Sequence, residues 1–369
     1  MITIPQCNPG ANTARHRPAI LRVIKEVIDG GRYIMGGACQ AFESAFAEYN
    51  GVTSCIGVAN GTDAIELILR ALGVGHGDCV ATVANTAVAT VAAIGRAGAS
   101  PRFADIDAAT FNMCSRSLSQ LLDKERRIKA VVVVHLFGHP ANIGEILLIA
   151  KRYGIPVIED CAQAHGAMVG GRKVGSFGVA GAYSFYPTKN LGALGDGGAV
   201  ITSDLTLADR VQMLRQYGWR ERYVSEIQGI NSRLDEVQAA ILLAKLPHLD
   251  SENEKRREVA SLYRQQLFGA SDSQFPIEQQ GVKHVYHQFV LRVKLREIVV
   301  QRLKELDVGT AVHYPMPIHR QPAYRDVPLA VPLTVTDEVQ GEILSLPMFP
   351  ELSQKQIKTV IASVKRVLA

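Results

Sequence analysis

The chain has 369 residues, of which 47% are hydrophobic and 20% charged, and its formal net charge at pH 7 is +5. This composition is typical of a globular protein, and the length favours about two domains. The charged residues are spread along the chain and form no basic block, which argues against an arm that binds nucleic acid or a membrane. We therefore expect neither nucleic acid nor a membrane as a partner.

The first residues carry no export signal. Residues 1–18 lack a charged start followed by an apolar run, so we expect a cytoplasmic protein. Most of the six cysteines lie in apolar surroundings and no two have a metal-ligand spacing, so we expect buried free thiols and no metal site. The uncharged window at 79–95 is short for a membrane span and indicates a buried strand, a turn and a helix.

Short apolar runs alternate with amphipathic stretches between about residue 55 and residue 215. Strands are predicted at 55–59, 78–84, 101–106, 130–137, 155–161, 181–186 and 198–203. Helices are predicted between the first five of them, at 62–72, 87–98, 117–127 and 143–154. Such alternation is typical of a mostly parallel sheet that is covered by helices.

The pattern changes near Leu234. Residues 233–267 form one long helical pattern, with an expected bend at Pro247. The segments beyond it, up to a helix at 353–368, indicate a smaller α+β unit. We therefore predict a large domain over residues 1–245, which includes an N-terminal arm, and a small domain over residues 246–369.

The glycine-rich segments match neither the dinucleotide fingerprint nor the P-loop, which disfavours both classes of nucleotide-binding protein. The turn at Asn60, Gly61 and Thr62 instead leads directly from a strand into a helix. Backbone N–H groups at a helix start, together with the Thr62 hydroxyl, can bind a phosphate. A plain helix cap is the alternative interpretation of the same residues.

Two further strands end in polar residues. Asp160 lies at the carboxyl end of strand 155–161, where open α/β sheets bind ligands, so it can hold a cationic ring nitrogen and Gln163 can reach the same ligand. Ser184 and Lys189 follow in the same way, and a desolvated lysine is suited to Schiff-base chemistry. A capping aspartate and a solvated loop lysine are the alternatives. Taken together, however, these groups supply the phosphate site, the counter-charge and the amine that pyridoxal phosphate (PLP) requires.

At these residues the chain resembles the DegT-type nucleotide-sugar aminotransferases of PLP fold type I, the aspartate aminotransferase-like group. The resemblance runs through YIMGGACQAFESAFAEYNG, NGTDAI, VVVVHLFGHPANI, IEDCAQAHGA, YSFYPTKNLGALGDGGAV, GINSRLDEVQAA and HYPMPIHRQPAY. It implies an α/β fold, with a mostly parallel seven-stranded sheet in the large domain and a smaller C-terminal α+β domain.

The resemblance also implies a role for each matching residue. Lys189 would be the catalytic residue and hold the PLP cofactor as a Schiff base, while Asp160 would pair with the ring nitrogen and Gln163 with the ring hydroxyl. The cofactor phosphate would be bound by Gly61, Thr62 and Ser184.

Other matching residues point to a shared site. Asn231 would reach the phosphate from the neighbouring subunit, which implies a homodimer with shared active sites. The segment that holds His313, Tyr314 and His319 lies near the sugar nucleotide in this family.

The implied reaction moves the amino group of L-glutamate, which leaves as 2-oxoglutarate, to a nucleotide-linked keto-deoxysugar. The segments YGWRERY and NSRLDEVQAA are most similar to members that act at C3 of a dTDP-3-keto-6-deoxyhexose. The amino sugar would serve a surface polysaccharide, such as a lipopolysaccharide O-antigen, or a glycosylated natural product. The alternatives are a PLP-dependent sugar dehydratase, which has histidine in place of the lysine, a non-catalytic PLP-binding regulatory protein, and a binding module without this chemistry.

The chain departs from the family pattern at two positions. Ala87 stands where an aromatic residue commonly stacks on the cofactor ring, and His139 stands where glutamine is more usual. Three acidic residues near the motifs are expected to have structural roles: Glu159, which alternates away from Asp160 on its strand, and Asp105 and Asp107.

Overall fold

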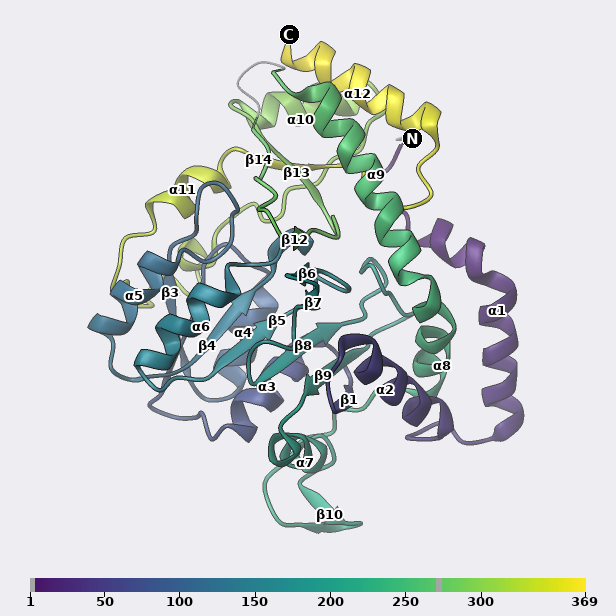
Figure 1. The fold of residues 1–369 in the computed structure, drawn as a ribbon, viewed down its shortest axis with the longest axis vertical. Coiled ribbons are helices and arrows are strands. Elements are labelled where there is room, and N and C mark those ends of the chain that lie inside the picture. Colours follow the sequence, from purple (N-terminus) through teal and green to yellow (C-terminus); the bar gives the residue numbers. More distant parts are fainter. Residues whose placement is uncertain (1–3, 270–273) are drawn as a thin grey trace.

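The computed structural model describes residues 4–269 and 274–369, and its centre is a seven-stranded sheet (Figure 1). The strands are β1 (Ser54–Val58), β2 (Cys79–Val83), β3 (Ser100–Ala104), β4 (Ile128–Val134), β5 (Val157–Asp160), β8 (Ala180–Ser184) and β9 (Gly198–Thr202). Their order is β1-β9-β8-β5-β4-β2-β3, and only β9 runs antiparallel to its neighbours. The mostly parallel seven-stranded sheet that the sequence predicts is therefore confirmed.

Helices cover both faces of this sheet: α3 (Gly61–Ala71), α4 (Val88–Arg96), α5 (Ser115–Lys124), α6 (Ile143–Arg152) and α7 (Leu205–Leu214). Strand β4 shows why its sequence is an unbroken apolar run. Val131 and Val133 pack in the core with α5 and α6, whereas Ala130 and Val132 pack in the core with α3, α4 and α7. Side chains alternate along a strand, so a sheet that is buried on both faces needs apolar residues at every position.

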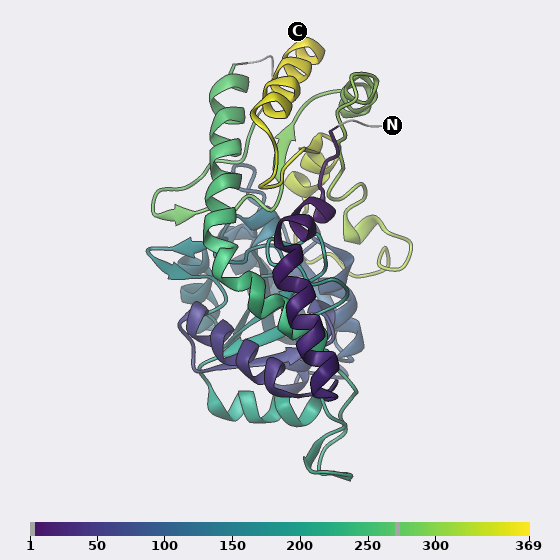
Figure 2. The ribbon, with the colours of Figure 1, turned by 90° about the vertical axis from the view of Figure 1, so that its right-hand side faces the viewer.

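The long helical pattern is divided in two. It consists of α8 (Glu236–Lys245), a 3-10 turn (Leu246–His248) that contains Pro247, and α9 (Leu249–Leu267), so the expected bend is confirmed. Helix α9 leads away from the sheet toward the C-terminal elements, as both views show (Figures 1 and 2). These elements are β13 (Phe289–Arg292), β14 (Ile343–Leu346), α10 (Arg296–Glu305), α11 (Thr334–Gln340) and α12 (Gln354–Leu368).

Most of the C-terminal elements share a hydrophobic core of their own, whereas α11 packs through Val339 in the core that contains α5 and α6. Tyr263 on α9, Phe289 on β13, Leu303 on α10 and Val364 on α12 belong to one buried cluster. We therefore retain the division between residues 245 and 246 as a proposal, because it falls at the break between α8 and α9.

The remaining elements surround these two cores. Helices α1 (Pro9–Gly30) and α2 (Gly37–Asn50) form the N-terminal arm, and α1 packs on α8 through Ile20, Val23 and Val27. The short strands are β6 (Met168–Val169), β7 (Arg172–Lys173), β10 (Trp219–Glu221), β11 (Val224–Ser225) and β12 (Val282–Lys283); further 3-10 turns lie at Leu136–Gly138 and Ile318–Arg320. Among the described residues, no helix combines the length and the apolar character that crossing a bilayer requires.

Candidate active site

A cavity of about 260 Å³ opens at the carboxyl edge of the sheet. Its wall is formed by residues at or just after the carboxyl ends of β1, β2, β4, β5 and β8, the edge at which parallel sheets bind ligands. Six of the residues predicted from the sequence line this one cavity: Gly61, Thr62, Asp160, Gln163, Ser184 and Lys189. Gly61 and Lys189, which are 128 positions apart in the chain, thus lie in the wall of the same cavity, as the sequence motifs predicted.

The first turn of α3 forms one end of the cavity. The Asn60 side chain caps this helix by accepting a hydrogen bond from the Asp63 N–H at 2.8 Å. Gly61 and Thr62 precede Asp63 in the first turn, where backbone N–H groups have no partner within the helix and can bind an anion. A Cβ atom at Gly61 would lie only 2.7 Å from Cβ of Ser184. The absence of a side chain at Gly61 therefore lets the helix start approach the end of β8.

Asp160 lies at the end of β5, and its side chain is held on both oxygens. Thr90 Oγ1 donates to Asp160 Oδ2 at 2.8 Å, and the Ala162 N–H donates to Oδ1 at 3.1 Å. Burial raises the pKa of the Asp160 carboxyl, while these hydrogen bonds and the charge of Lys189 act in the opposite direction. A bound cation would act in the same direction as these hydrogen bonds and Lys189, and would favour the ionised form of Asp160.

Lys189 lies in the loop after β8, and its backbone N–H donates to the Tyr186 carbonyl at 2.8 Å. Burial lowers the pKa of the Lys189 amine to about 8, against the smaller opposing effect of the Asp160 charge. A larger fraction of this amine than of an ordinary lysine side chain is therefore neutral near physiological pH, and only a neutral amine attacks a carbonyl carbon. The loop lysine that the sequence alone left ambiguous is thus held in the cavity wall beside a carboxylate.

Gln163 is fixed by two contacts. Its Oε1 accepts from the Phe137 N–H at 2.6 Å, and its Nε2 donates to the Tyr314 hydroxyl at 2.9 Å. Tyr314 is therefore adjacent to the cavity, as its predicted place near the substrate requires. His313 contacts Ser345 Oγ through Nδ1 at 2.9 Å, and burial together with the charge of Lys189 lowers its pKa to about 4.

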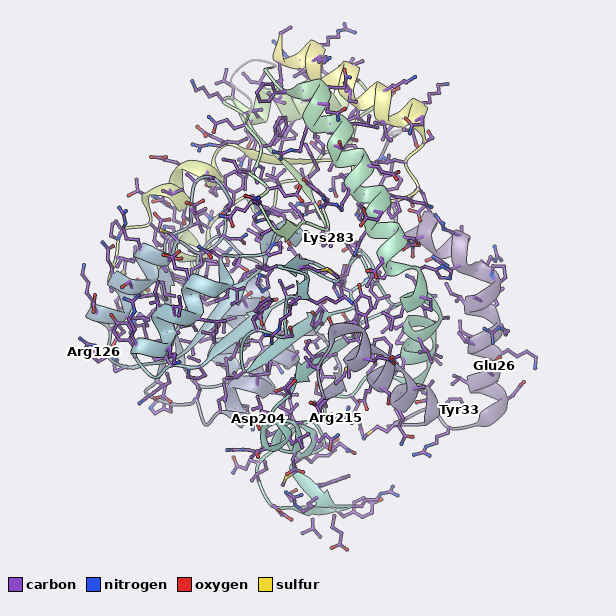
Figure 3. The ribbon with its side chains drawn as sticks, in the orientation of Figure 1. Glu26, Tyr33, Arg126, Asp204, Arg215 and Lys283 are labelled. Carbon is purple, nitrogen blue, oxygen red and sulfur yellow. The ribbon has the colours of Figure 1, made fainter. Side chains whose placement is uncertain are left out.

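His313 and Tyr314 do not line the cavity themselves, and two further predicted residues, His319 and Asn231, also lie outside its wall. His319 Nε2 is 3.1 Å from Asp337 Oδ1 on α11, so this histidine contacts the C-terminal part of the chain. Asn231 is exposed, and its neighbour Ser232 is anchored by donating its N–H to the Arg215 carbonyl at 3.0 Å. Figure 3 places Arg215 beside α2 and α7. The roles of His319 and Asn231 stay predictions.

The two departures from the family pattern have different locations. Ala87 lines the cavity, where the only aromatic ring among the lining residues is that of Tyr186, a residue that is 53% exposed. His139 instead is buried away from the cavity wall, where its Nδ1 is 3.1 Å from Asn112 Nδ2. The small side chain at position 87 thus leaves part of the cavity wall without an aromatic surface.

The acidic residues that were expected to be structural do hold the fold. Glu159 faces away from Asp160 and accepts hydrogen bonds from the backbone N–H groups of Gly175, Phe177 and Gly178 at 2.7–2.8 Å. Asp105 accepts from the N–H groups of Val335 and Thr336 at 2.9 Å and so caps the first turn of α11. Asp107 likewise accepts from two backbone N–H groups of the turn that follows it.

Sequence reasoning missed the hydroxyl groups behind Asp160. Thr86 and Thr90 line the cavity, yet in the sequence they belong to the apolar stretch ANTAVAT that indicates only a buried helix. Thr90 donates a hydrogen bond to Asp160, which lies 70 positions further along the chain, and no local spacing rule reports such a contact.

The donor set of this cavity fits PLP. A helix start with its first N–H groups suits the phosphate, an anchored carboxylate suits a protonated ring nitrogen, and an amine of lowered pKa suits the aldehyde. The close approach at Gly61 keeps the phosphate site and Ser184 within one small cavity. The six predicted residues that line the cavity therefore supply the three groups that anchor the cofactor.

Known proteins are similar to this chain in sequence and in fold. A family model for the DegT/DnrJ/EryC1/StrS aminotransferase family matches residues 15–365. The chain is 43% identical over 352 residues to a dTDP-3-amino-3,6-dideoxy-alpha-D-galactopyranose transaminase of Aneurinibacillus thermoaerophilus. The aligned region covers 95% of this chain and 96% of that protein. It is also 42% identical over 366 residues to a pleiotropic regulatory protein of Geobacillus stearothermophilus, with 98% of each chain covered.

Solved structures agree with this assignment. DesV of S. venezuelae, in complex with a ketimine intermediate, matches with a TM-score of 0.96 and 37% identity over 99% of this chain and 98% of that chain. NtdA of Bacillus subtilis, with the bound cofactor PMP, matches with a TM-score of 0.93 and 28% identity over 100% of this chain and 86% of that chain. The chain belongs to the DegT/DnrJ/EryC1/StrS aminotransferase family, a family of PLP-dependent nucleotide-sugar aminotransferases.

Proposed function

We propose that this protein transfers the amino group of L-glutamate to C3 of a dTDP-3-keto-6-deoxyhexose. The observation that carries the proposal is the presence of Lys189, Asp160 and the α3 helix start in one cavity. The relative from Aneurinibacillus thermoaerophilus, a transaminase that is named for a dTDP-3-amino sugar, supports the choice of nucleotide and of carbon. The aminated sugar would enter a surface polysaccharide, such as a lipopolysaccharide O-antigen, or a glycosylated natural product.

The residues of the cavity divide the work of this reaction. When bound, PLP withdraws electrons from the α-carbon of the amino acid and so makes its proton acidic. We assign Asp160 to the ring nitrogen, Gln163 to the ring hydroxyl, and the α3 start with Ser184 to the phosphate. Lys189 Nζ would hold the cofactor in the resting protein and afterwards carry the α-proton, a task for which a pKa of about 8 is suited.

We propose further that the active unit is a cytoplasmic homodimer with shared sites. Asn231 is exposed and does not line the cavity of its own chain, which fits a residue that binds the phosphate in the partner's site. The sugar nucleotide would be contacted by His313, Tyr314 and His319. Tyr314 has the most direct support, because it bonds Gln163 in the cavity wall.

Two alternatives use the same cofactor. A sugar dehydratase is disfavoured because lysine, and not histidine, occupies position 189. A non-catalytic regulatory role is favoured by one observation, the 42% identity to a protein named as a pleiotropic regulator. Both alternatives differ from the proposal in whether nitrogen is transferred to a sugar.

The decisive experiment incubates the PLP-loaded protein with L-glutamate and a dTDP-3-keto-6-deoxyhexose and follows the sugar by mass spectrometry. We expect an amino sugar and an equal amount of 2-oxoglutarate. The Lys189→Arg variant should lose roughly 100- to 10,000-fold of the rate, whereas Lys151→Arg, an exposed lysine on α6, should keep it. Loss of water from the sugar without nitrogen transfer would indicate a dehydratase, and PLP binding without any turnover would indicate a regulator.

A further inference from the structure

Two buried threonines form a hydrogen-bonded chain that ends on Asp160. Thr86 Oγ1 lies 3.1 Å from Thr90 Oγ1, and Thr90 Oγ1 lies 2.8 Å from Asp160 Oδ2. The exposed fractions of Thr86 and Thr90 are 2% and 1%, so water does not compete for these contacts. Both threonines come from the first turn of α4 and the residues before it, at the same edge of the sheet as the end of β5.

The direction of this chain follows from proton counting. An ionised carboxylate only accepts hydrogen bonds, and a threonine hydroxyl has a single proton. Thr90 must therefore give its proton to Asp160, and Thr86 must donate to the Thr90 oxygen. Each donor polarises the next one, so the chain directs two aligned O–H dipoles toward the carboxylate and stabilises its negative charge.

We propose that the Thr86–Thr90 chain is the positioning device that keeps Asp160 ionised and oriented toward the cofactor ring nitrogen. The inference rests on the proposed role of Asp160. It adds Thr90 as a residue that acts on the cofactor through another residue, and Thr86 as the residue that orients Thr90.

The need for such a device follows from the surroundings of Asp160. Its side chain is almost entirely buried, with 5% of the residue exposed, and burial disfavours the ionised form. The titratable groups that interact electrostatically with this carboxylate are Lys189, His135, Tyr314 and Cys161. The hydrogen bond from Thr90 is the largest of the effects that lower the pKa of this carboxylate, ahead of the Ala162 N–H and the charge of Lys189, so the hydroxyl chain carries a large share of the stabilisation.

The test compares Thr90→Val, which removes the hydroxyl at nearly constant volume, with Thr90→Ser, which keeps it. The dissociation constant of PLP from the apoprotein is measured between pH 5 and pH 8.5, and the ring nitrogen of bound 15N-labelled PLP is followed by NMR. At pH 7 we expect roughly tenfold weaker binding for Thr90→Val, since a hydrogen bond to a charged group is lost. As the pH is lowered, the Thr90→Val variant should lose PLP binding at a higher pH than the wild type does. The 15N chemical shift of the PLP ring nitrogen bound to this variant should move toward the value of the unprotonated ring.

Thr90→Ser should resemble the wild type, and Thr86→Val should change the same quantities in the same direction by a smaller factor. Thr206→Val, an exposed threonine at the start of α7, is the matched control and should change nothing. Equal weakening at every pH with an unchanged 15N signal would mean that Thr90 only packs, and would overturn the inference. If the wild-type chain itself does not bind PLP, the proposed function fails and the inference fails with it; if the wild type binds and Thr90→Val behaves identically, only the inference fails.

Discussion

Replacing Gly61 by alanine sets two physical effects of opposite sign against each other. Gly61 is the first residue of α3, and alanine is the better helix former by up to about 1 kcal/mol. The new Cβ atom, however, would lie 2.7 Å from Cβ and 3.3 Å from Cα of Ser184. The first distance is far below van der Waals contact and involves the end of a central strand, so α3 and β8 must move apart.

The packing effect should prevail. Overpacking of a well-packed interior costs about 1–3 kcal/mol, which exceeds the helix-propensity gain. We therefore expect a free energy of unfolding about 1–2 kcal/mol lower in urea titrations of the apoprotein. We also expect at least about tenfold weaker PLP binding, because the helix N–H groups and the Ser184 hydroxyl no longer converge on one phosphate.

Gly144→Ala provides the matched control. Gly144 lies in the first turn of α6, and an added Cβ atom would meet no atom within 4 Å. This variant should be neutral or more stable by up to about 1 kcal/mol, with unchanged PLP binding. A Gly61→Ala protein that is as stable as Gly144→Ala and binds PLP like the wild type would refute the argument from close approach.

Three further predictions concern single side chains. The rate at which the apoprotein captures PLP, measured by stopped flow, should rise with pH and level off above about 8, the pKa of Lys189; a rate that still rises steeply at pH 10 would contradict it. Glu159→Gln should lower the free energy of unfolding by about 2–3 kcal/mol in urea without changing the dissociation constant of PLP, because Glu159 faces the Gly175–Gly178 turn. Asp105→Ala should cost about 1–2 kcal/mol in thermal unfolding through loss of the α11 cap, and an unchanged melting temperature would refute that role.

The central sheet was predictable because each of its strands is buried and short. Runs such as 130–137 have apolar side chains on both faces, and a helical stretch or a turn follows each run. The positions of Asp160, Ser184 and Lys189 follow from the same rule, because the carboxyl ends of parallel strands share one edge. The strands and these site residues therefore depend on local signals.

The parts that were not predicted depend on contacts between distant segments. Strands β6, β7 and β12 have two residues each, too few to show a periodic pattern, and β12 pairs with β6 across more than a hundred residues. The hydroxyl of Thr90 belongs to an apolar helix in the sequence and becomes part of the site only where α4 meets β5.

The assignments above all require that the cavity at the carboxyl edge binds PLP through Lys189. This can be examined by reducing the PLP-loaded protein with borohydride, digesting it, and locating the phosphopyridoxyl group by mass spectrometry. We expect one modified peptide with the group on Lys189, and no modification when the protein is treated with L-glutamate before reduction. A phosphopyridoxyl group on any other lysine, with Lys189 unmodified, would refute the assignment of Lys189.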